Sequence, residues 1–181
     1  IDYCNVQNNS APTAGAIHVS GNDTILSFNN FTHNQATSGQ GGSLSIGGTN
    51  ASLFYSSFEF NTATGEGGAI RWEGGHGHNS IVGCNFTNNT SHSSSAGGGA
   101  IFWTASVNNG PITSGGSIRD SIFINNTAYR HGGAIDWYSA KDSYFDNCTF
   151  INNHAHSDGG AIYSGHTTGG SSNLTISNSR F

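Results

Sequence analysis

The segment FINNTAYRHGGAIDW, residues 123–137, contains the two motifs that decide the fold of this 181-residue chain. In it an apolar residue is followed three positions later by Asn, and a GGAI string comes six positions after that Asn. The GGAI string occurs at Gly67–Ile70, Gly98–Ile101, Gly132–Ile135 and Gly159–Ile162, with degenerate copies at Ala14–Ile17 and Gly41–Leu44. Such self-similarity over the whole chain is typical of a solenoid.

The second motif, an apolar residue three positions before Asn, recurs in register with the first. Its copies are Val6/Asn9, Phe31/Asn34, Phe58/Asn61, Phe86/Asn89, Phe123/Asn126 and Phe150/Asn153, and Phe181 opens a further copy. Successive apolar members are 25 to 37 residues apart, so the repeat is short and accepts insertions. A unit of this size cannot bury its own apolar face, and neighbouring units must stack to form a core.

Strand-like alternation follows each GGAI string. The last position of the string and the position two further on are apolar in nearly every copy. A period of two indicates a strand with one buried face. The residues between these positions vary in chemistry and predict a solvent face: His18, Ser45, Arg71, Phe102, Asp136 and Tyr163. Trp72, Trp103 and Trp137, on consecutive copies, are expected to stack on one another in the core.

Two more columns predict structural features. The second glycine of each string predicts a corner, either a turn with positive φ or a backbone too close for a Cβ atom: Gly15, Gly42, Gly68, Gly99, Gly133 and Gly160. The Asn column predicts an internal ladder, because a buried amide needs partners on the next coil: Asn9, Asn34, Asn61, Asn89, Asn126 and Asn153. The predicted fold is an all-β parallel β-helix, a β-solenoid of about six coils with three short strands each, forming a single domain over residues 1–181.

The GGAI and FxxN motifs, alternating in register six times, resemble the repeats of the chlamydial polymorphic outer-membrane proteins and of adhesin-like surface proteins of archaea and protists. The resemblance covers essentially the whole chain. It implies a right-handed parallel β-helix. Because the shared residues are structural, it implies no catalytic residue.

Charge and composition exclude several partners. Five Lys and Arg against ten Asp and Glu give a net charge of -5, which is unlike the basic face that nucleic acid requires. No apolar stretch is long enough for a transmembrane helix, so we expect no membrane insertion.

Cys4, Cys84 and Cys148 share one column on coils too far apart for a disulfide, and we expect buried thiols.

Ten N-glycosylation acceptor sequences favour a secreted, glycosylated chain located outside the cell or at its surface. They begin at Asn8, Asn22, Asn30, Asn50, Asn85, Asn88, Asn89, Asn125, Asn147 and Asn173. The alternative is that Asn-rich turns generate unused acceptor sequences. Because the sequence starts at Ile1 with neither an initiator Met nor a signal peptide, we expect a processed product or a fragment.

Groups suited to catalysis or metal binding are scattered. Parallel β-helices that cleave polysaccharides need clustered carboxylates on an outward face, whereas Arg71 and Asp136 share a column but lie two coils apart. We therefore expect no enzymatic activity and no cofactor. His131, His154 and His156 are weak candidates for a metal site, and exposed polar loop residues are the alternative.

The first and last segments, Ile1–Val6 and Ile176–Phe181, are the same part of the repeat. Both ends of the solenoid are then expected to expose an apolar cross-section and unpaired strand edges. The expected function is structural: a segment or subunit of a surface fibre or stalk that self-associates end to end into a filament. One alternative is an adhesin module that binds glycans or a partner surface through the insertions Thr104–Ser117 and Gly165–Asn173. The other is a β-helical enzyme acting on polysaccharides.

Overall fold

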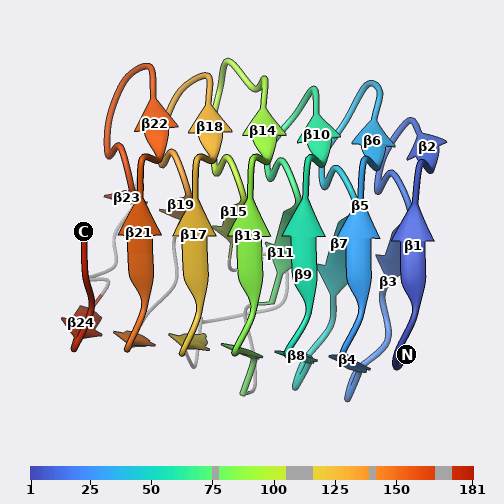
Figure 1. Cartoon of the computed structure of the whole chain (residues 1–181), viewed down its shortest axis with the longest axis horizontal. Helices are drawn as coiled ribbons and strands as arrows, with labels where there is room; N and C mark the ends of the chain where they lie inside the picture. Colours follow the sequence, from blue (N-terminus) through green and yellow to red (C-terminus); the bar gives the residue numbers. More distant parts are fainter. Residues whose placement is uncertain (75–77, 105–115, 139–141, 166–172) are drawn as a thin grey trace.

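The computed structural model describes residues 1–74, 78–104, 116–138, 142–165 and 173–181. Over these residues the chain winds through about six coils of short parallel strands, and no helix is present in them. Figure 1 shows the coils following one another along the long axis, with the N-terminal coil at one end and the C-terminal coil at the other. The predicted β-solenoid fold is confirmed.

Each coil contributes one strand to each of four parallel sheets. The FxxN sheet contains β1 (Asn5–Gln7), β5 (Asn30–Thr32), β9 (Ser57–Glu59), β13 (Asn85–Thr87), β17 (Ile122–Ile124) and β21 (Thr149–Ile151). The two-residue sheet contains β2 (Ser10–Ala11), β6 (Gln35–Ala36), β10 (Thr62–Ala63), β14 (Thr90–Ser91), β18 (Thr127–Ala128) and β22 (His154–Ala155). The arrangement therefore has four strands per coil where the sequence predicts three, because strands of two residues are too short to show alternation.

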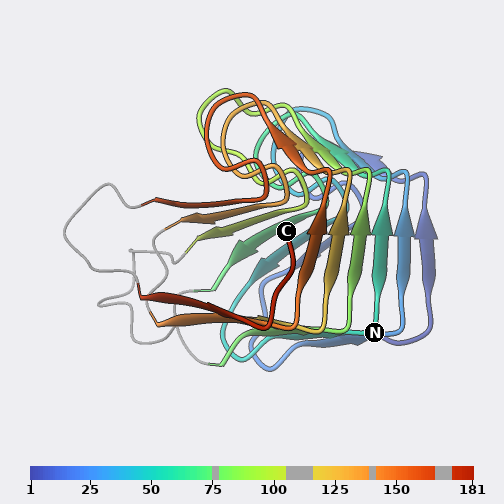
Figure 2. The same cartoon turned by 60° about the vertical axis from the view of Figure 1, so that its left-hand side comes forward.

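The other two sheets complete each coil. The GGAI sheet contains β3 (Ile17–Val19), β7 (Leu44–Gly47), β11 (Ile70–Glu73), β15 (Ile101–Thr104), β19 (Ile135–Tyr138) and β23 (Ile162–Gly165). The closing sheet contains β4 (Ile25–Ser27), β8 (Ser52–Phe54), β12 (Ser80–Val82), β16 (Ser117–Arg119), β20 (Ser143–Asp146) and β24 (Leu174–Ser177). Figure 2 shows the FxxN strands as one row of parallel arrows and the closing strands along the lower side.

The core consists of columns of like residues, because the register places equivalent positions of the repeat directly above one another. Phe31 pairs with Phe58, and their rings stack with centroids 4.7 Å apart. Phe181 continues this column and stacks on Phe150 at 5.0 Å. Trp72, Trp103 and Trp137 are at most 1% exposed and stack at 4.5 and 4.6 Å, so the prediction of a buried Trp column is confirmed.

The predicted solvent face of the GGAI sheet is wrong for three of its six coils, whereas Arg71 is partly exposed. Ser45, Phe102 and Asp136 are buried, with exposures of 8%, 7% and 0%. Asp136 accepts a hydrogen bond from the backbone of Gly97, which belongs to the connection between β14 and β15. The connection between β14 and β15 therefore covers the outer surface of the sheet at Asp136.

The cysteine prediction holds for two residues of three. Cys84 and Cys148 are buried, and burial raises the pKa of the Cys84 thiol to about 12. Cys4 is exposed because it lies on the first coil, where no earlier coil packs against it. All three are free thiols.

Candidate functional site

The asparagine column forms a ladder of hydrogen bonds inside the solenoid. Asn61 illustrates the pattern: its backbone N–H and its Nδ2 both donate to Oδ1 of Asn89 at 3.0 Å, and Nδ2 also donates to the carbonyl of Phe31 at 3.0 Å. The same amide-to-amide bonds run from Asn9 through Asn34, Asn61, Asn89 and Asn126 to Asn153. Each donor therefore points toward the following coil, and the ladder has a direction.

The two ends of the ladder are complementary. On the first coil, Oδ1 of Asn9 accepts no hydrogen bond from any described residue, while its N–H and Nδ2 are used. On the last coil, the backbone N–H of Asn153 has no acceptor among the described residues, while its Oδ1 is used. One end thus offers an amide acceptor and the other offers a donor.

The two glycines of each GGAI string have different structural roles, positive φ for the first and close backbone contact for the second. Positive φ belongs to the first glycine of the string, as at Gly132 (φ 62) and Gly98 (φ 74), and not to the second. The second glycine is needed for close approach of backbones: a Cβ on Gly133 would lie 2.0 Å from the carbonyl oxygen of Gly160. The same contact with the following coil recurs at Gly15, Gly42, Gly68 and Gly99, whereas Gly160 has its nearest atom at 3.5 Å.

The glycosylation candidates differ sharply in accessibility. Asn89 is fully buried in the ladder, so its prediction as a glycan site is wrong: its Nδ2 is already bonded to two acceptors. Asn88 is half-buried. The exposed candidates are Asn8, Asn22, Asn30, Asn50, Asn85, Asn125, Asn147 and Asn173.

Four of the exposed candidates are tied to another side chain. Asn50, Asn147 and Asn173 each donate Nδ2 to the carboxylate of an aspartate one coil earlier, over 3.1, 2.7 and 2.9 Å. Asn30 accepts a hydrogen bond at 2.6 Å from Ser57. The side chains of Asn8, Asn22, Asn85 and Asn125 bond no other side chain in the described part of the chain.

The histidine candidates do not form a cluster of metal ligands. His131 Nδ1 lies 3.1 Å from Oδ2 of Asp158, and its Nε2 accepts from Nε of Arg130 at 2.9 Å, so both ring nitrogens face protein groups. The rings of His154 and His156 lie edge to face at 5.0 Å. Over residues 1–74, 78–104, 116–138, 142–165 and 173–181, no three His, Cys, Asp or Glu side chains come together as a metal site.

A buried carboxyl group lies under the connection between β14 and β15, which the sequence does not predict. Oδ2 of Asp136 accepts from the N–H of Gly97 at 2.8 Å, while its Oδ1 is buried with no partner among the described residues. Burial raises the pKa of Asp136 to about 7; the Gly97 hydrogen bond opposes this rise, and the charge of Glu66 adds to it. Glu66 accepts from the hydroxyl of Ser95 at 3.2 Å in the same connection. Asp136 and Glu66 therefore both bond to residues of this connection.

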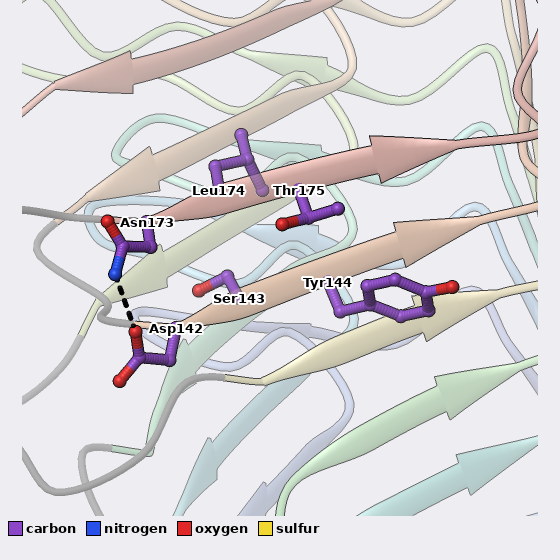
Figure 3. Close-up of a pocket in the computed structure, with 6 residues that line it drawn as sticks. All are labelled: Asp142, Ser143, Tyr144, Asn173, Leu174 and Thr175. Carbon is purple, nitrogen blue, oxygen red and sulfur yellow. Dashed lines mark hydrogen bonds between the residues drawn. The ribbon is translucent and has the colours of Figure 1, made fainter.

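An open hollow of about 690 Å³ lies on the closing sheet between β20 and β24. Figure 3 shows the hydrogen bond from Asn173, which precedes β24, to Asp142, which precedes β20, and the side chain of Tyr144 on β20. The guanidinium of Arg119 lies 5.3 Å from the Tyr144 ring centroid. Among the described residues that line the hollow, Asp142 is the one carboxylate, whereas a glycosidase site has a pair of acids. The predicted binding insertions, Thr104–Ser117 and Gly165–Asn173, lie almost entirely outside the described residues.

Two stacks of exposed aromatic rings, which the repeat motifs do not predict, border the FxxN sheet on the first three coils. Tyr3, Phe28 and Tyr55 stack with ring centroids 4.9 and 5.3 Å apart at one border. His33 and Phe60 stack at 5.0 Å at the other. We call these two stacks the aromatic rails. The signal in the sequence is that the same columns hold Gly, Asp or Asn in later coils, as at Gly83 and Asn88.

Comparison with known proteins supports the repeat type. Residues 83–102, 120–136 and 147–165 match the family described as the Chlamydia polymorphic membrane protein repeat. Each match begins at or shortly before an FxxN strand and ends in or just after the following GGAI string, so the resemblance drawn from the motifs is confirmed for three successive coils. The matched segments make up well under half of the chain. No curated protein and no solved structure matches the chain significantly. The described residues include no helix long and apolar enough to cross a membrane.

Proposed function

We propose that this chain is a non-catalytic structural segment of a β-helical protein at a cell surface, and that it extends by stacking end face on end face. The repeat match supports the surface location, because the matched repeat is described as that of a membrane protein. The directional amide ladder is the observation that carries the stacking proposal. The free Oδ1 of Asn9 at one end and the free N–H of Asn153 at the other are the two halves of the bond that joins every internal pair of coils.

The strand edges favour the same head-to-tail arrangement. β2 and β3 are edge strands at the first coil, and β22 and β23, which belong to the same two sheets, are edge strands at the last. Unpaired edges tend to pair with further strands. A head-to-tail joint continues the two-residue and GGAI sheets in their parallel register, and in it Ile1–Val6 of the incoming chain takes the place next to β21 that Arg180 and Phe181 occupy in the single chain. A head-to-head joint would bring two sets of like groups together. A heterologous contact of this kind propagates into a filament.

Sedimentation velocity of the purified chain over a range of concentrations tests the stacking. We expect oligomers that grow with concentration and appear as thin rods by electron microscopy. Val6→Glu places a charge in the apolar column of the first coil and should give a monomer. Gln7→Glu, on the neighbouring outward position of β1, serves as the matched control and should still assemble. A parent chain that stays monomeric at the highest concentration reached would contradict the proposal.

The second part of the proposal is that N-glycans occupy Asn8, Asn22, Asn85 and Asn125, whose exposed amides bond no other side chain. Flexible glycans at these lateral positions would hinder side-by-side association and leave the end faces free. Peptide mass spectrometry after enzymatic glycan removal in heavy-oxygen water labels each occupied Asn. Labelling of these four sites with none at the buried Asn89 supports the proposal, and an unlabelled native chain overturns it.

A further inference from the structure

The two columns that hold the aromatic rails lie at the corners beside the FxxN sheet, and their residue types differ from coil to coil. Every described residue in these two columns has positive φ, including Tyr3 (55°), Phe28 (55°), Tyr55 (45°), His33 (54°) and Phe60 (54°). In later coils the same columns hold Gly83, Asp120 and Asn147 on one side, and Asn88, Asn125 and Asn152 on the other. Gly, Asn and Asp tolerate this conformation, and bulky aromatic residues are disfavoured in it. The second column holds Asn8 on the first coil, so the disfavoured residues are Tyr3, Phe28 and Tyr55 in one column and Phe60 in the other.

Burial does not explain the choice. Tyr3, Phe28, Tyr55 and Phe60 are 77%, 46%, 57% and 46% exposed. Their rings do gain stacking contacts with one another, but those contacts join exposed rings at strained positions. Strained residues that persist on a surface are a signal of function, and exposed aromatic rings are typical of binding surfaces.

The surface between the aromatic rails is flat and polar. It consists of the outward residues of β1, β5 and β9, which lie side by side in Figure 1. We call it the amide strip; its residues are Asn5, Gln7, Asn30, Thr32, Ser57 and Glu59. The two rails lie on either side of the strip. On one coil the two rail residues, such as Tyr55 and Phe60, are five residues apart, which is roughly 16 Å for a fully extended chain. Glu59 is its one charged residue, and it contains no Lys or Arg.

We propose that the amide strip, with the aromatic rails, binds a linear uncharged polysaccharide lying along the solenoid axis. The amides and hydroxyls supply donors and acceptors for sugar hydroxyls, and the ring rims supply apolar contacts for sugar C–H groups. The rails repeat every 4.9 to 5.3 Å, the advance of one coil, and a polymer of identical sugar rings matches such a repeat better than an irregular protein surface does. An anionic polysaccharide would require cationic side chains that the strip lacks.

This inference is independent of end-to-end stacking. The glycan proposed at Asn8, next to Gln7, would confine the strip to β5 and β9, and binding there requires an unmodified Asn30. That residue begins an acceptor sequence and lies in the middle of the strip, where its Oδ1 accepts from Ser57. A glycan attached there would cover the strip. An occupied Asn30 in the native protein would therefore overturn the inference.

The test uses the full chain made without glycans and its co-sedimentation with microcrystalline cellulose, chitin and insoluble mannan. We expect binding to at least one of the three and none to heparin. The triple variant Phe28→Asn, Tyr55→Asn, Phe60→Asn replaces rail residues by the residue type of later coils. It should bind at least tenfold more weakly while its unfolding midpoint stays the same or rises. Tyr129→Asn changes an equally exposed aromatic residue away from the strip, at 58% exposure, and should bind like the parent.

A second variant leaves the corners intact. Thr32→Arg places a bulky cation on the strip and should also reduce binding at least tenfold. Ile124→Arg, in the same column two coils beyond the strip, is its matched control and should not. Three results would overturn the inference: no binding to any of the three polymers, equal binding by Thr32→Arg, or preferential binding to heparin. A triple variant that loses stability together with binding would assign the rails a structural role instead.

Discussion

Replacing Gly133 by Ala tests the requirement for close contact between coils. The added Cβ would lie 2.0 Å from the carbonyl oxygen of Gly160 and 2.5 Å from the nitrogen of His154, whereas ordinary contact begins near 3.4 Å. The two coils would have to separate by more than 1 Å. This movement would break the bonds from Gly133 N to Gly159 O at 3.0 Å and from Ala134 N to Ala161 O at 2.9 Å. Two lost hydrogen bonds and the overpacking together cost about 3 to 5 kcal/mol.

Urea unfolding followed by far-ultraviolet circular dichroism measures this cost, and hydrogen exchange locates it between the fifth and sixth coils. Gly160→Ala is the matched control from the same column, because its Cβ would have its nearest contact, the carbonyl oxygen of Asn153, at 3.5 Å. It should change stability by less than about 1 kcal/mol. Gly21→Ala, with no atom within 4 Å, should be nearly neutral. Equal effects at Gly133 and Gly160 would refute the argument from close contact.

Three further predictions concern the interior. The pKa of Asp136 is raised from 3.8 to about 7 in the folded chain, so between these pH values the unfolded state binds fewer protons than the folded state. The free energy of unfolding should therefore fall as pH rises from about 4 to 7, by up to about 4 kcal/mol. Asp136→Asn should largely remove this pH dependence in urea titrations, and an unchanged slope would contradict the assignment. Asn89→Ala leaves the N–H and Nδ2 of Asn61 without their acceptor and should cost about 2 to 4 kcal/mol in urea unfolding, against a near-neutral Asn5→Ala on the surface. Trp103→Ala opens the centre of the Trp column and should cost about 3 to 5 kcal/mol, and acrylamide should quench the tryptophan fluorescence of the folded parent only weakly; strong quenching would place the rings at the surface.

The features that sequence reasoning could reach are those that every coil repeats. Phe31, Phe58 and Phe86 align because identical positions recur, and the register then follows from the repeat itself. The Asn ladder is predictable for the same reason, since a polar residue repeated in a core column needs a partner in the adjacent copy. These columns specify the fold without any long-range information from elsewhere in the chain.

The features that sequence reasoning missed belong to individual coils. Asp136 is buried because the connection between β14 and β15 has six residues, 92–97, before its GGAI string, whereas the next coil has three, 129–131. The longer connection reaches the strand of a neighbouring coil, where Gly97 bonds Asp136. The aromatic rails were missed because their positive φ is a property of the corner. A lone Tyr or Phe in the sequence gives no sign of that backbone conformation.

The four sheets have a mechanical consequence, because their hydrogen bonds connect successive coils and so run along the solenoid axis. A pulling force between the two ends loads one interface between coils after another. Once a terminal coil detaches, the next becomes the terminal coil, and each detachment releases 25 to 37 residues of slack chain. A stalk built in this way lengthens in steps under tension and dissipates energy at each step. It would act as an extensible tether and would not snap like a rigid rod.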